Sequence, residues 1–172
     1  MTLQVSEKFD MGQMVQFMSS PDVYWSLNDA LAPPPEMVDF REHMAQPSIR
    51  TLACTFVGVV FGYVQFVRRT SVCAEVTCAF HPQFRGKTAK VLGEYALAWA
   101  FQQYGLAKII CAIPSDNRVA IVAAKVMGFS LEGRFTKAIV RQPNGLTDIL
   151  LFGLRKDQWY GHTIRAGTKG NV

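Results

Sequence analysis

The sequence lacks any apolar run that approaches the roughly 20 residues needed by a membrane-spanning helix. Its first residues, Met1 to Lys8, also lack the basic and then apolar arrangement of a secretory signal peptide. No internal repeat or low-complexity tract divides the 172 residues. We therefore expect one domain over residues 1–160 and a flexible tail over residues 161–172. We also expect a cytoplasmic protein with no membrane partner.

Cysteine is scarce, and its spacing does not match a metal-binding motif. The four cysteines, Cys54, Cys73, Cys78 and Cys111, all lie in apolar, strand-like segments. No histidine or aspartate is placed to support a catalytic thiol. We interpret the cysteines as reduced core residues of a cytoplasmic protein, and we predict no metal site.

Positive charge is in moderate excess, and the basic residues are dispersed along the chain. The net charge is +5 and the pI is about 9.2. Dispersed cations lack the dense or aromatic-interleaved pattern of nucleic-acid-binding segments, so we expect no specific nucleic acid. The excess suits an anionic ligand, although ordinary surface charge accounts for it as well. A hydrophobic content of 49% is sufficient for a sizeable core.

The most informative stretch of the sequence is a strand, a tight loop and a helix in immediate succession. The strand covers Glu75–Phe80, the loop covers His81–Thr88, and the helix runs from Ala89 to Tyr104 with apolar residues at helical spacing. The start of a helix leaves backbone N–H groups without partners and carries the positive end of the helix dipole. Arg85 and Lys87 add two cations at this point. The loop therefore predicts a binding site for a diphosphate.

The flanking elements predict a mixed sheet. Strands are expected over residues 3–8, 72–80, 107–113, 136–141 and 146–154, and two more over 50–69; helices are expected over 11–18, 36–45 and 117–127. Three consecutive strands indicate an antiparallel meander, whereas the strand–helix–strand unit after them gives a right-handed crossover and a parallel pair. We expect an α+β fold with helices on both faces of a mostly antiparallel sheet. A ligand arm can enter where the central parallel strands splay apart.

The loop sequence resembles a known cofactor-binding motif. Residues Gln83–Thr88 resemble the pyrophosphate loop of the GNAT acetyltransferase superfamily, which is Gln or Arg, two residues, Gly, one residue, and Gly or Ala. Thr88 departs from the small final residue. Asn117, a helix and then Gly128-Phe129 are similar to the family's next motif. Glu132-Gly133-Arg134 resembles the branch of the family that acetylates ribosomal-protein N-termini.

This resemblance covers roughly residues 52–159 and implies a GNAT fold and an acetyl-CoA-dependent N-acetyltransferase. Such an enzyme moves an acetyl group directly to a primary amine of a protein or peptide N-terminus, or of a small amine. The implied cofactor-binding residues act largely through their backbone and are Cys78, Ala79, Phe80, Gln83, Phe84, Arg85, Gly86, Lys87, Thr88, Ala89 and Asn117. Asn117 also suits a helix N-cap. The sequence leaves a homodimer open.

Two residues are candidates for the base that removes a proton from the amine. Glu75 is a carboxylate in an otherwise apolar strand that ends at the loop, and some family members use a glutamate on this strand. The alternative for Glu75 is a solvated position on the sheet. His81 is the second candidate, although histidines in loops are more often surface residues. Ala124 stands where many family members carry a tyrosine acid, so the general acid is not assigned.

Two aromatic residues are candidates for the acceptor site. We expect the N-terminal region to form one wall of that site, lined by Tyr24 and Trp25, with core packing as the alternative for both side chains. A different function is also compatible with the sequence, because the tyrosine acid is missing and the protein is basic. That alternative is a non-catalytic binding module with the same fold for a protein or nucleic-acid partner.

Overall fold

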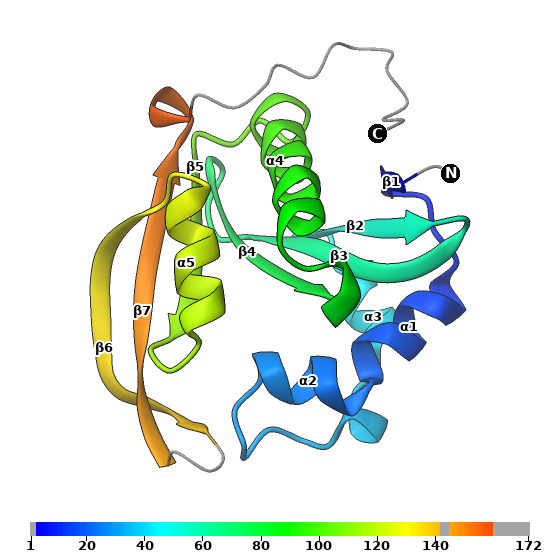
Figure 1. The fold of residues 1–172 in the computed structure, drawn as a ribbon, viewed down its shortest axis with the longest axis horizontal. Coiled ribbons are helices and arrows are strands. Elements are labelled where there is room, and N and C mark those ends of the chain that lie inside the picture. The colour runs from blue at the N-terminus through cyan, green and yellow to red at the C-terminus, as the bar shows by residue number, and fades with distance from the viewer. Residues whose placement is uncertain (1–2, 142–144, 160–172) are drawn as a thin grey trace.

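The computed structural model describes residues 3–141 and 145–159, which form a seven-stranded sheet with helices on both faces (Figure 1). The strands are β1 Leu3–Ser6, β2 Ile49–Phe56, β3 Val59–Arg68, β4 Cys73–Phe80, β5 Lys108–Pro114, β6 Ser130–Arg141 and β7 Gly145–Arg155. The helices are α1 Met11–Ser19, α2 Pro21–Leu27, α3 Phe40–Ala45, α4 Lys87–Gln102 and α5 Arg118–Val126, with 3-10 turns η1 Pro35–Met37, η2 Pro82–Phe84 and η3 Lys156–Gln158. The tail predicted over residues 161–172 lies outside the described residues, and the limits of the predicted single domain stay a prediction.

The sheet has one parallel pair at its centre. The strand order is β1-β2-β3-β4-β5-β7-β6, and β4 and β5 pair in parallel while the other neighbours pair antiparallel. Helix α4 connects β4 to β5 and returns the chain to the end of the sheet at which β4 begins, as a parallel connection requires. The predicted α+β fold with a central parallel pair is therefore confirmed.

Two clusters of buried side chains hold helices on opposite faces of the sheet. The larger cluster lies under α4 and α5 and includes Phe66, Phe101 and Phe152, which are almost fully buried. The smaller cluster lies under α1, α2 and α3 and includes Met14 and Tyr63. Strand residues contribute to the two clusters alternately, because successive side chains point to opposite faces. Within the described ranges, none of these helices is long and apolar enough to cross a membrane.

The N-terminal helices differ from the sequence-based expectation. No helix was predicted between residues 18 and 36, but α2 begins at Pro21, in the first turn of a helix, where proline is tolerated. The helix expected over residues 36–45 is shorter and starts at Phe40. Asp39 sets this start, because its carboxylate accepts hydrogen bonds from the amides of Arg41 and Glu42, each at 3.0 Å.

Strand β6 is longer than the sequence pattern predicts. It begins at Ser130 rather than near Thr136. Register shifts interrupt its pairing with β7 beside Gly133 and after Phe135, and Lys137 has a φ of 50°. Each irregularity shifts the alternation of side chains, so the period-two pattern that identifies a strand is lost along the sequence.

Gly62 in β3 marks a close approach between strands. It pairs with Phe80, the last residue of β4. A Cβ atom at Gly62 would lie 2.6 Å from Cδ1 of Phe80 and 2.9 Å from the carbonyl oxygen of Ala79. The second contact involves backbone and is not relieved by a side-chain rotation. Glycine is therefore required here to bring β4 to its end beside the loop.

We expect Gly62→Ala to lower the free energy of unfolding by about 2 kcal/mol, since overpacking of this kind is not relieved locally. For a domain of this size that corresponds to a fall of about 4–8 °C in Tm, measurable by circular dichroism. Gly133→Ala is the control, because its Cβ would meet Leu151 at 3.6 Å, an ordinary contact. Equal melting temperatures for the two variants would contradict this account.

Candidate active site

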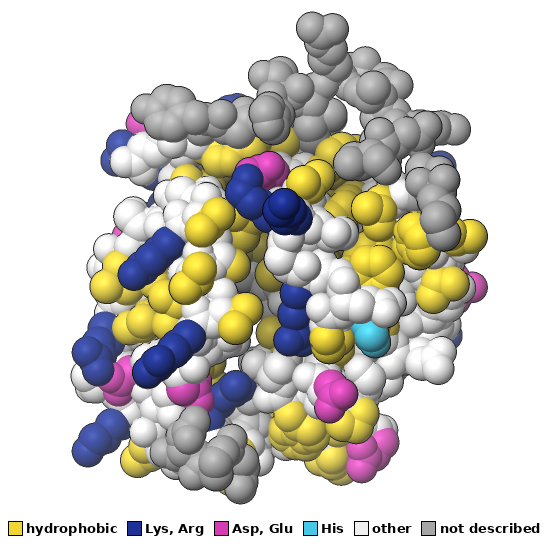
Figure 2. All heavy atoms as spheres, in the orientation of Figure 1, with side chains coloured by type: hydrophobic (Ala, Val, Ile, Leu, Met, Phe, Trp, Pro, Cys, Tyr) yellow, Lys and Arg dark blue, Asp and Glu magenta, His cyan; other side chains and the backbone are white. Residues whose placement is uncertain are grey.

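The parallel strands separate after only three paired positions. The last pair is Glu75 with Ile110. Beyond it β4 continues along β3 and β5 continues along β7, and no register links the two strands to each other within the described residues. Figure 1 shows β4 diverging from β7, and Figure 2 shows a recess between the half of the molecule with α5 and the half with α4. The facing strand edges therefore carry backbone groups that lack a partner strand.

Cys78 lies on the separated part of β4. Its side chain is exposed, yet protein atoms surround it closely enough that desolvation raises the pKa of the thiol to about 11. Cys78 is therefore accessible on the part of β4 that no longer pairs with β5. The thiol is protonated at neutral pH and suits a lining role better than a nucleophilic one.

The loop after β4 is held in place by its own hydrogen bonds. The amides of Phe84 and Arg85 donate to the carbonyls of His81 and Pro82, at 2.9 and 3.2 Å. The Nε atom of Arg85 donates to the carbonyl of Phe80 at 3.1 Å. Two of the backbone donors predicted for the cofactor, those of Phe84 and Arg85, are therefore already bonded within the loop.

The first turn of α4 keeps its donors available. Gly86 is the N-cap of α4, and no side chain among the described residues caps this turn. Gly86 has a φ of 79° and a ψ of −127°, which side chains other than that of glycine disfavour. An added Cβ at Gly86 would meet nothing within 4 Å. Open space beside a bare helix N-terminus fits a diphosphate, which the N–H groups of residues 87–89 can bind.

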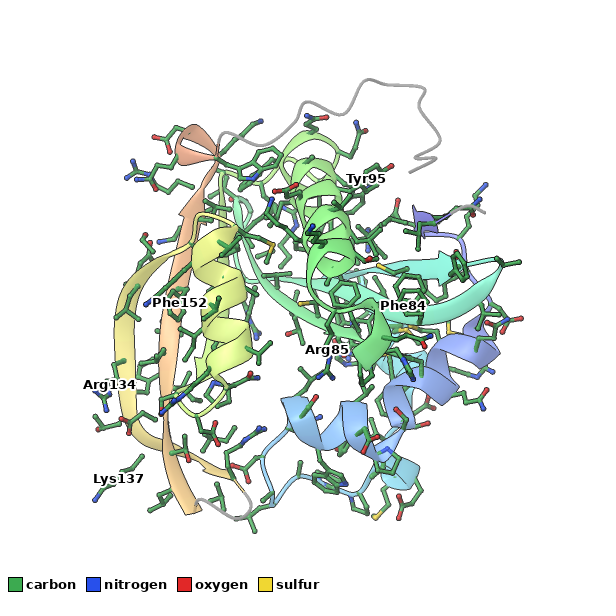
Figure 3. All side chains as sticks on the ribbon, in the orientation of Figure 1. Phe84, Arg85, Tyr95, Arg134, Lys137 and Phe152 are labelled. Carbon is green, nitrogen blue, oxygen red and sulfur yellow. The ribbon has the colours of Figure 1, made fainter. Side chains whose placement is uncertain are left out.

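Charged and apolar side chains of the loop have separate roles. Arg85 and Lys87 are exposed, as is Gln83, whereas Thr88 and Ala89 are half-buried. Figure 3 shows Arg85 projecting from the loop toward the space between α4 and α5. The ring of Phe84 points the other way and stacks on Phe61, with centroids 4.0 Å apart. Phe84 therefore anchors the loop, while Arg85, held by its bond to the Phe80 carbonyl, and Lys87 are exposed where an anion can approach.

Asn117 lies at the opposite wall of the crevice, on the connection from β5 to α5. Its side-chain oxygen accepts a hydrogen bond from the amide of Ala120 at 3.1 Å. This bond makes Asn117 the N-cap of α5, which was one of its two expected roles. Its contact with a cofactor stays a prediction.

Glu75 occupies the point at which β4 and β5 separate. Its carboxylate accepts hydrogen bonds from Nη2 and Nε of Arg69, at 2.6 and 3.0 Å. Ala74 and Val76 pack under α4, so Glu75 lies on the other face of the sheet, toward the N-terminal helices. This position suits a proton acceptor for an amine that arrives on that face. The ion pair with Arg69 supports the plainer alternative of a solvated pair, and the catalytic role stays a prediction.

The other two positions of interest for proton transfer are His81 and Ala124. His81 is exposed at the end of β4, and its amide donates to the carbonyl of Phe61 at 2.8 Å. Its ring lies edge-on to Phe84, with centroids 6.5 Å apart. Ala124 is buried in the core beneath α5, so this position supplies no proton donor to a leaving thiolate.

An open hollow of about 370 Å³ lies between the end of α2 and the end of β6. Its lining residues are Trp25, Asn28, Ala30, Val140 and Arg141. Arg141 also places the hollow near the C-terminal end of β5, because its Nε atom lies 3.8 Å from Oδ2 of Asp116. The hollow therefore lies at the end toward which the crevice opens.

The two aromatic residues predicted for the acceptor site have different surroundings. Trp25 lines the hollow and is 39% exposed. Tyr24 is 5% exposed and donates its hydroxyl to the carbonyl of Pro33 at 2.5 Å. Asn28 and Arg141, which also line the hollow, were missed in the sequence, since contacts between such distant segments leave no local pattern.

A separated parallel pair that ends at a bare helix N-terminus defines a site for the long arm and diphosphate of a coenzyme. The family model described as "Acetyltransferase (GNAT) family" matches residues 17–129, which is more than half of the chain. The chain therefore belongs to the GNAT acetyltransferase family. It is an acetyltransferase that uses acetyl-CoA as its acetyl donor, and the predicted family, enzyme class and co-substrate are confirmed.

Solved structures share this fold at low sequence identity. A spermidine N-acetyltransferase from Vibrio cholerae, in complex with CoA and spermine, superposes with a TM-score of 0.77 at 16% identity, covering 91% of this chain and 97% of that one. A ribosomal-protein-S5-alanine acetyltransferase from Vibrio fischeri gives 0.70 at 15% identity, covering 92% and 96%. A GNAT-family acetyltransferase from Streptococcus pneumoniae gives 0.70 at 18% identity, covering 89% and 99%. No curated protein matches the sequence.

The described residues fit coenzyme A. The open space at Gly86, the uncapped N–H groups of residues 87–89 and the two neighbouring cations suit its diphosphate. The separated strand edges, including residues 78–80, supply backbone donors and acceptors for its amide-containing arm. When bound, acetyl-CoA supplies an activated thioester. The residues predicted for the cofactor lie at the end of β4, in the loop and first turn of α4, and at the start of α5, and their contacts with a cofactor stay predictions.

We expect Gly86→Glu to abolish binding of CoA, because it places a side chain and a negative charge where the diphosphate is proposed to lie. The loss should be about 100-fold or more in Kd by isothermal titration calorimetry, equivalent to about 2.7 kcal/mol. Gly105→Glu is the matched control: Gly105 also has a positive φ, of 68°, and open space, but lies beyond the other end of α4. Unchanged affinity in Gly86→Glu would mean that the diphosphate binds elsewhere.

Proposed function

We propose that the enzyme acetylates the α-amine of a peptide or protein N-terminus. The observation that supports this acceptor is the lining of the hollow beside α2, which contains no acidic side chain among the described residues. A polyamine carries several positive charges, which are best held by carboxylates, and the described lining supplies none. A peptide N-terminus carries a single amine beside neutral amide groups, and such groups suit the indole of Trp25 and the amide of Asn28.

The carboxylates near the hollow are already engaged. Asp29 accepts hydrogen bonds from the amides of Val140 and Leu31, which lower the pKa of its carboxyl. Asp116 pairs with Arg141. Neither carboxylate is left as an obvious partner for the ammonium groups of a polyamine. The fold alone does not decide between acceptors, because both the spermidine enzyme and the ribosomal-protein enzyme share it.

Proton chemistry also favours an α-amine. An amine attacks only when it is neutral, and the ordinary pKa is about 7.7–8.0 for an α-amine and about 10.4 for a lysine side chain. A sizeable fraction of α-amines is therefore neutral near pH 7.5 without help from the protein. The base then has to accept a proton only as the new amide bond forms, and we assign this role to Glu75.

The other residues of the crevice act by binding and orientation. Backbone N–H groups on the separated edge of β4 are suited to polarise a carbonyl oxygen, which increases its reactivity toward an amine. The protonated thiol of Cys78 does not compete as a nucleophile. The amine reaches the carbonyl from the side of α2. Because no nucleophilic side chain is assigned in the crevice, the amine attacks the thioester directly and no acyl-enzyme forms.

Release of free thiol in the presence of acetyl-CoA tests the proposed acceptor. The acceptors are a hexapeptide that begins with alanine, the same peptide with a blocked N-terminus, spermidine and propylamine. We expect kcat/KM for the free peptide to exceed that for spermidine at least about tenfold, which corresponds to about 1.4 kcal/mol. Preference for spermidine would make the acceptor class wrong. No release above hydrolysis with any amine would make the proposed function wrong.

We expect Glu75→Gln to lower kcat about 100-fold or more and to leave the Kd for CoA unchanged, as for loss of a general base. Arg69→Gln is the matched control, because it breaks the same ion pair and keeps the carboxylate. Steady-state kinetics and calorimetry give the two constants. Similar losses of kcat in the two variants would assign Glu75 to the ion pair rather than to proton transfer.

A further inference from the structure

The chain after α2 is hydrogen-bonded to β6 across the open end of the crevice. The amide of Ala30 donates to the carbonyl of Val140 at 2.9 Å. In return, the amide of Val140 donates to Oδ2 of Asp29 at 2.7 Å, between residues 111 positions apart in sequence. The other carboxylate oxygen of Asp29 accepts from the amide of Leu31 at 2.7 Å, which fixes the side chain. We call residues 28–30 and 140–141 together the α2–β6 strap.

Arg141 fastens the strap to a third segment. Its Nη1 atom donates to the carbonyls of Trp25 and Ser26, at 3.2 and 3.0 Å. These carbonyls belong to the last turn of α2, where a helix leaves acceptors unpaired and carries partial negative charge. The Nε atom of the same guanidinium lies 3.8 Å from Oδ2 of Asp116, on the connection from β5 to α5. With 16% of its side chain exposed, Arg141 links α2, β6 and the start of α5.

The strap joins two halves of the molecule that the separation of β4 from β5 divides. Helix α2 belongs to the half with β2 and β3, because Tyr24 packs in one cluster with Ala53 and Tyr63. Strand β6 belongs to the other half, at the edge of the sheet beside β7. Figure 1 shows the chain after α2 meeting the end of β6 at the side of the molecule toward which β4 diverges from β7. The strap therefore crosses the opening through which an acceptor reaches the crevice.

We propose that Asp29 and Arg141 are positioning residues for the acceptor, which they serve by holding α2 against β6. Four of the five residues that line the hollow, Trp25, Ala30, Val140 and Arg141, take part in the bonds described above. The fifth, Asn28, lies at the end of α2 that these bonds hold. The inference rests on the proposed function and adds the residues that set the shape of its acceptor site. None of the strap's bonds described above involves a residue predicted to bind the cofactor, so we expect CoA to bind with the same affinity when the strap is broken.

The test compares Asp29→Ala and Arg141→Gln with Arg134→Gln. Arg134 is the matched control because it is an arginine of the same strand that pairs with Asp148 instead of with α2. Figure 3 shows Arg134 at the outer edge of the molecule. With the alanine-starting hexapeptide, we expect KM to rise about tenfold in each strap variant, as for the loss of charge-assisted hydrogen bonds. The Kd for CoA should stay within about twofold, and Arg134→Gln should match the unmodified enzyme.

Hydrogen exchange supplies a readout that does not depend on activity. The amides of Ala30 and Val140 should exchange faster in both strap variants, because local opening of the strap exposes them. The double variant should resemble the single ones, since both residues hold the same contact and their effects are not additive. The KM of Arg141→Lys should lie between those of the unmodified enzyme and Arg141→Gln. An ammonium can still donate to the α2 carbonyls but lacks the several donors of the planar guanidinium.

Three outcomes would overturn the inference. An unchanged KM in both variants, despite faster exchange at Ala30 and Val140, would show that the strap does not position the acceptor. A loss of CoA affinity and of Tm in parallel with the rise in KM, in the milder Asp29→Asn and Arg141→Lys as well as in the first variants, would show general damage instead of a positioning role. No transfer by the unmodified enzyme to any amine would remove the proposed function and this inference together. If the unmodified enzyme acetylates the peptide, the proposed function holds, and the strap variants then test only the role of the strap.

Discussion

The separation of β4 from β5 after Glu75 is the constraint on which the rest of the structure depends. A sheet loses hydrogen bonds when two central strands part, so each strand needs another partner. β3 supplies one for β4 and β7 supplies one for β5, and the chain continues as a strand on both sides of the crevice. The core beneath α4 and α5 then holds the halves together, because Phe66, Ile109 and Phe152 belong to one cluster. The protein therefore stays stable although these strand edges are unpaired, and their backbone groups are available to bind a ligand.

The anion site at the start of α4 likewise depends on backbone groups, here N–H groups, that no described side chain binds. Hydrogen bonds inside the loop use the amides of Phe84 and Arg85, and stacking of Phe84 on Phe61 fixes the loop. Gly86 then starts the helix with open space beside it, and no described side chain caps the N–H groups that follow. The loop is thus fixed by its own contacts, while the first turn of α4 keeps uncapped N–H groups. A diphosphate gains most from donors that are already oriented, so the two features act together.

Local pattern predicted the central unit, because the β4 strand, Gly86 and the apolar stripe of α4 are each readable over a few residues. Local pattern did not predict α2, the start of β6 or the contacts between segments far apart in the sequence. α2 is seven residues long, which is too short to show a clear helical repeat, and the irregular register of β6 obscured its alternation. Tyr24 and Trp25 are adjacent in sequence, but consecutive helical residues point about 100° apart, so one is buried and the other lines the hollow. The pairing of Asp29 with Val140 had no local signal at all.

The irregularities of β6 have a consequence beyond the site. β6 is an edge strand, and an edge strand is a template to which another polypeptide can add by backbone pairing. The positive φ of Lys137, the register shifts and the outward cations at Arg134 and Lys137 all make this edge crooked and charged. The opposite edge, β1, is four residues long. Both rims of the sheet are thereby poor nuclei for intermolecular aggregation, even though β6 itself exposes the apolar side chains of Leu131 and Phe135.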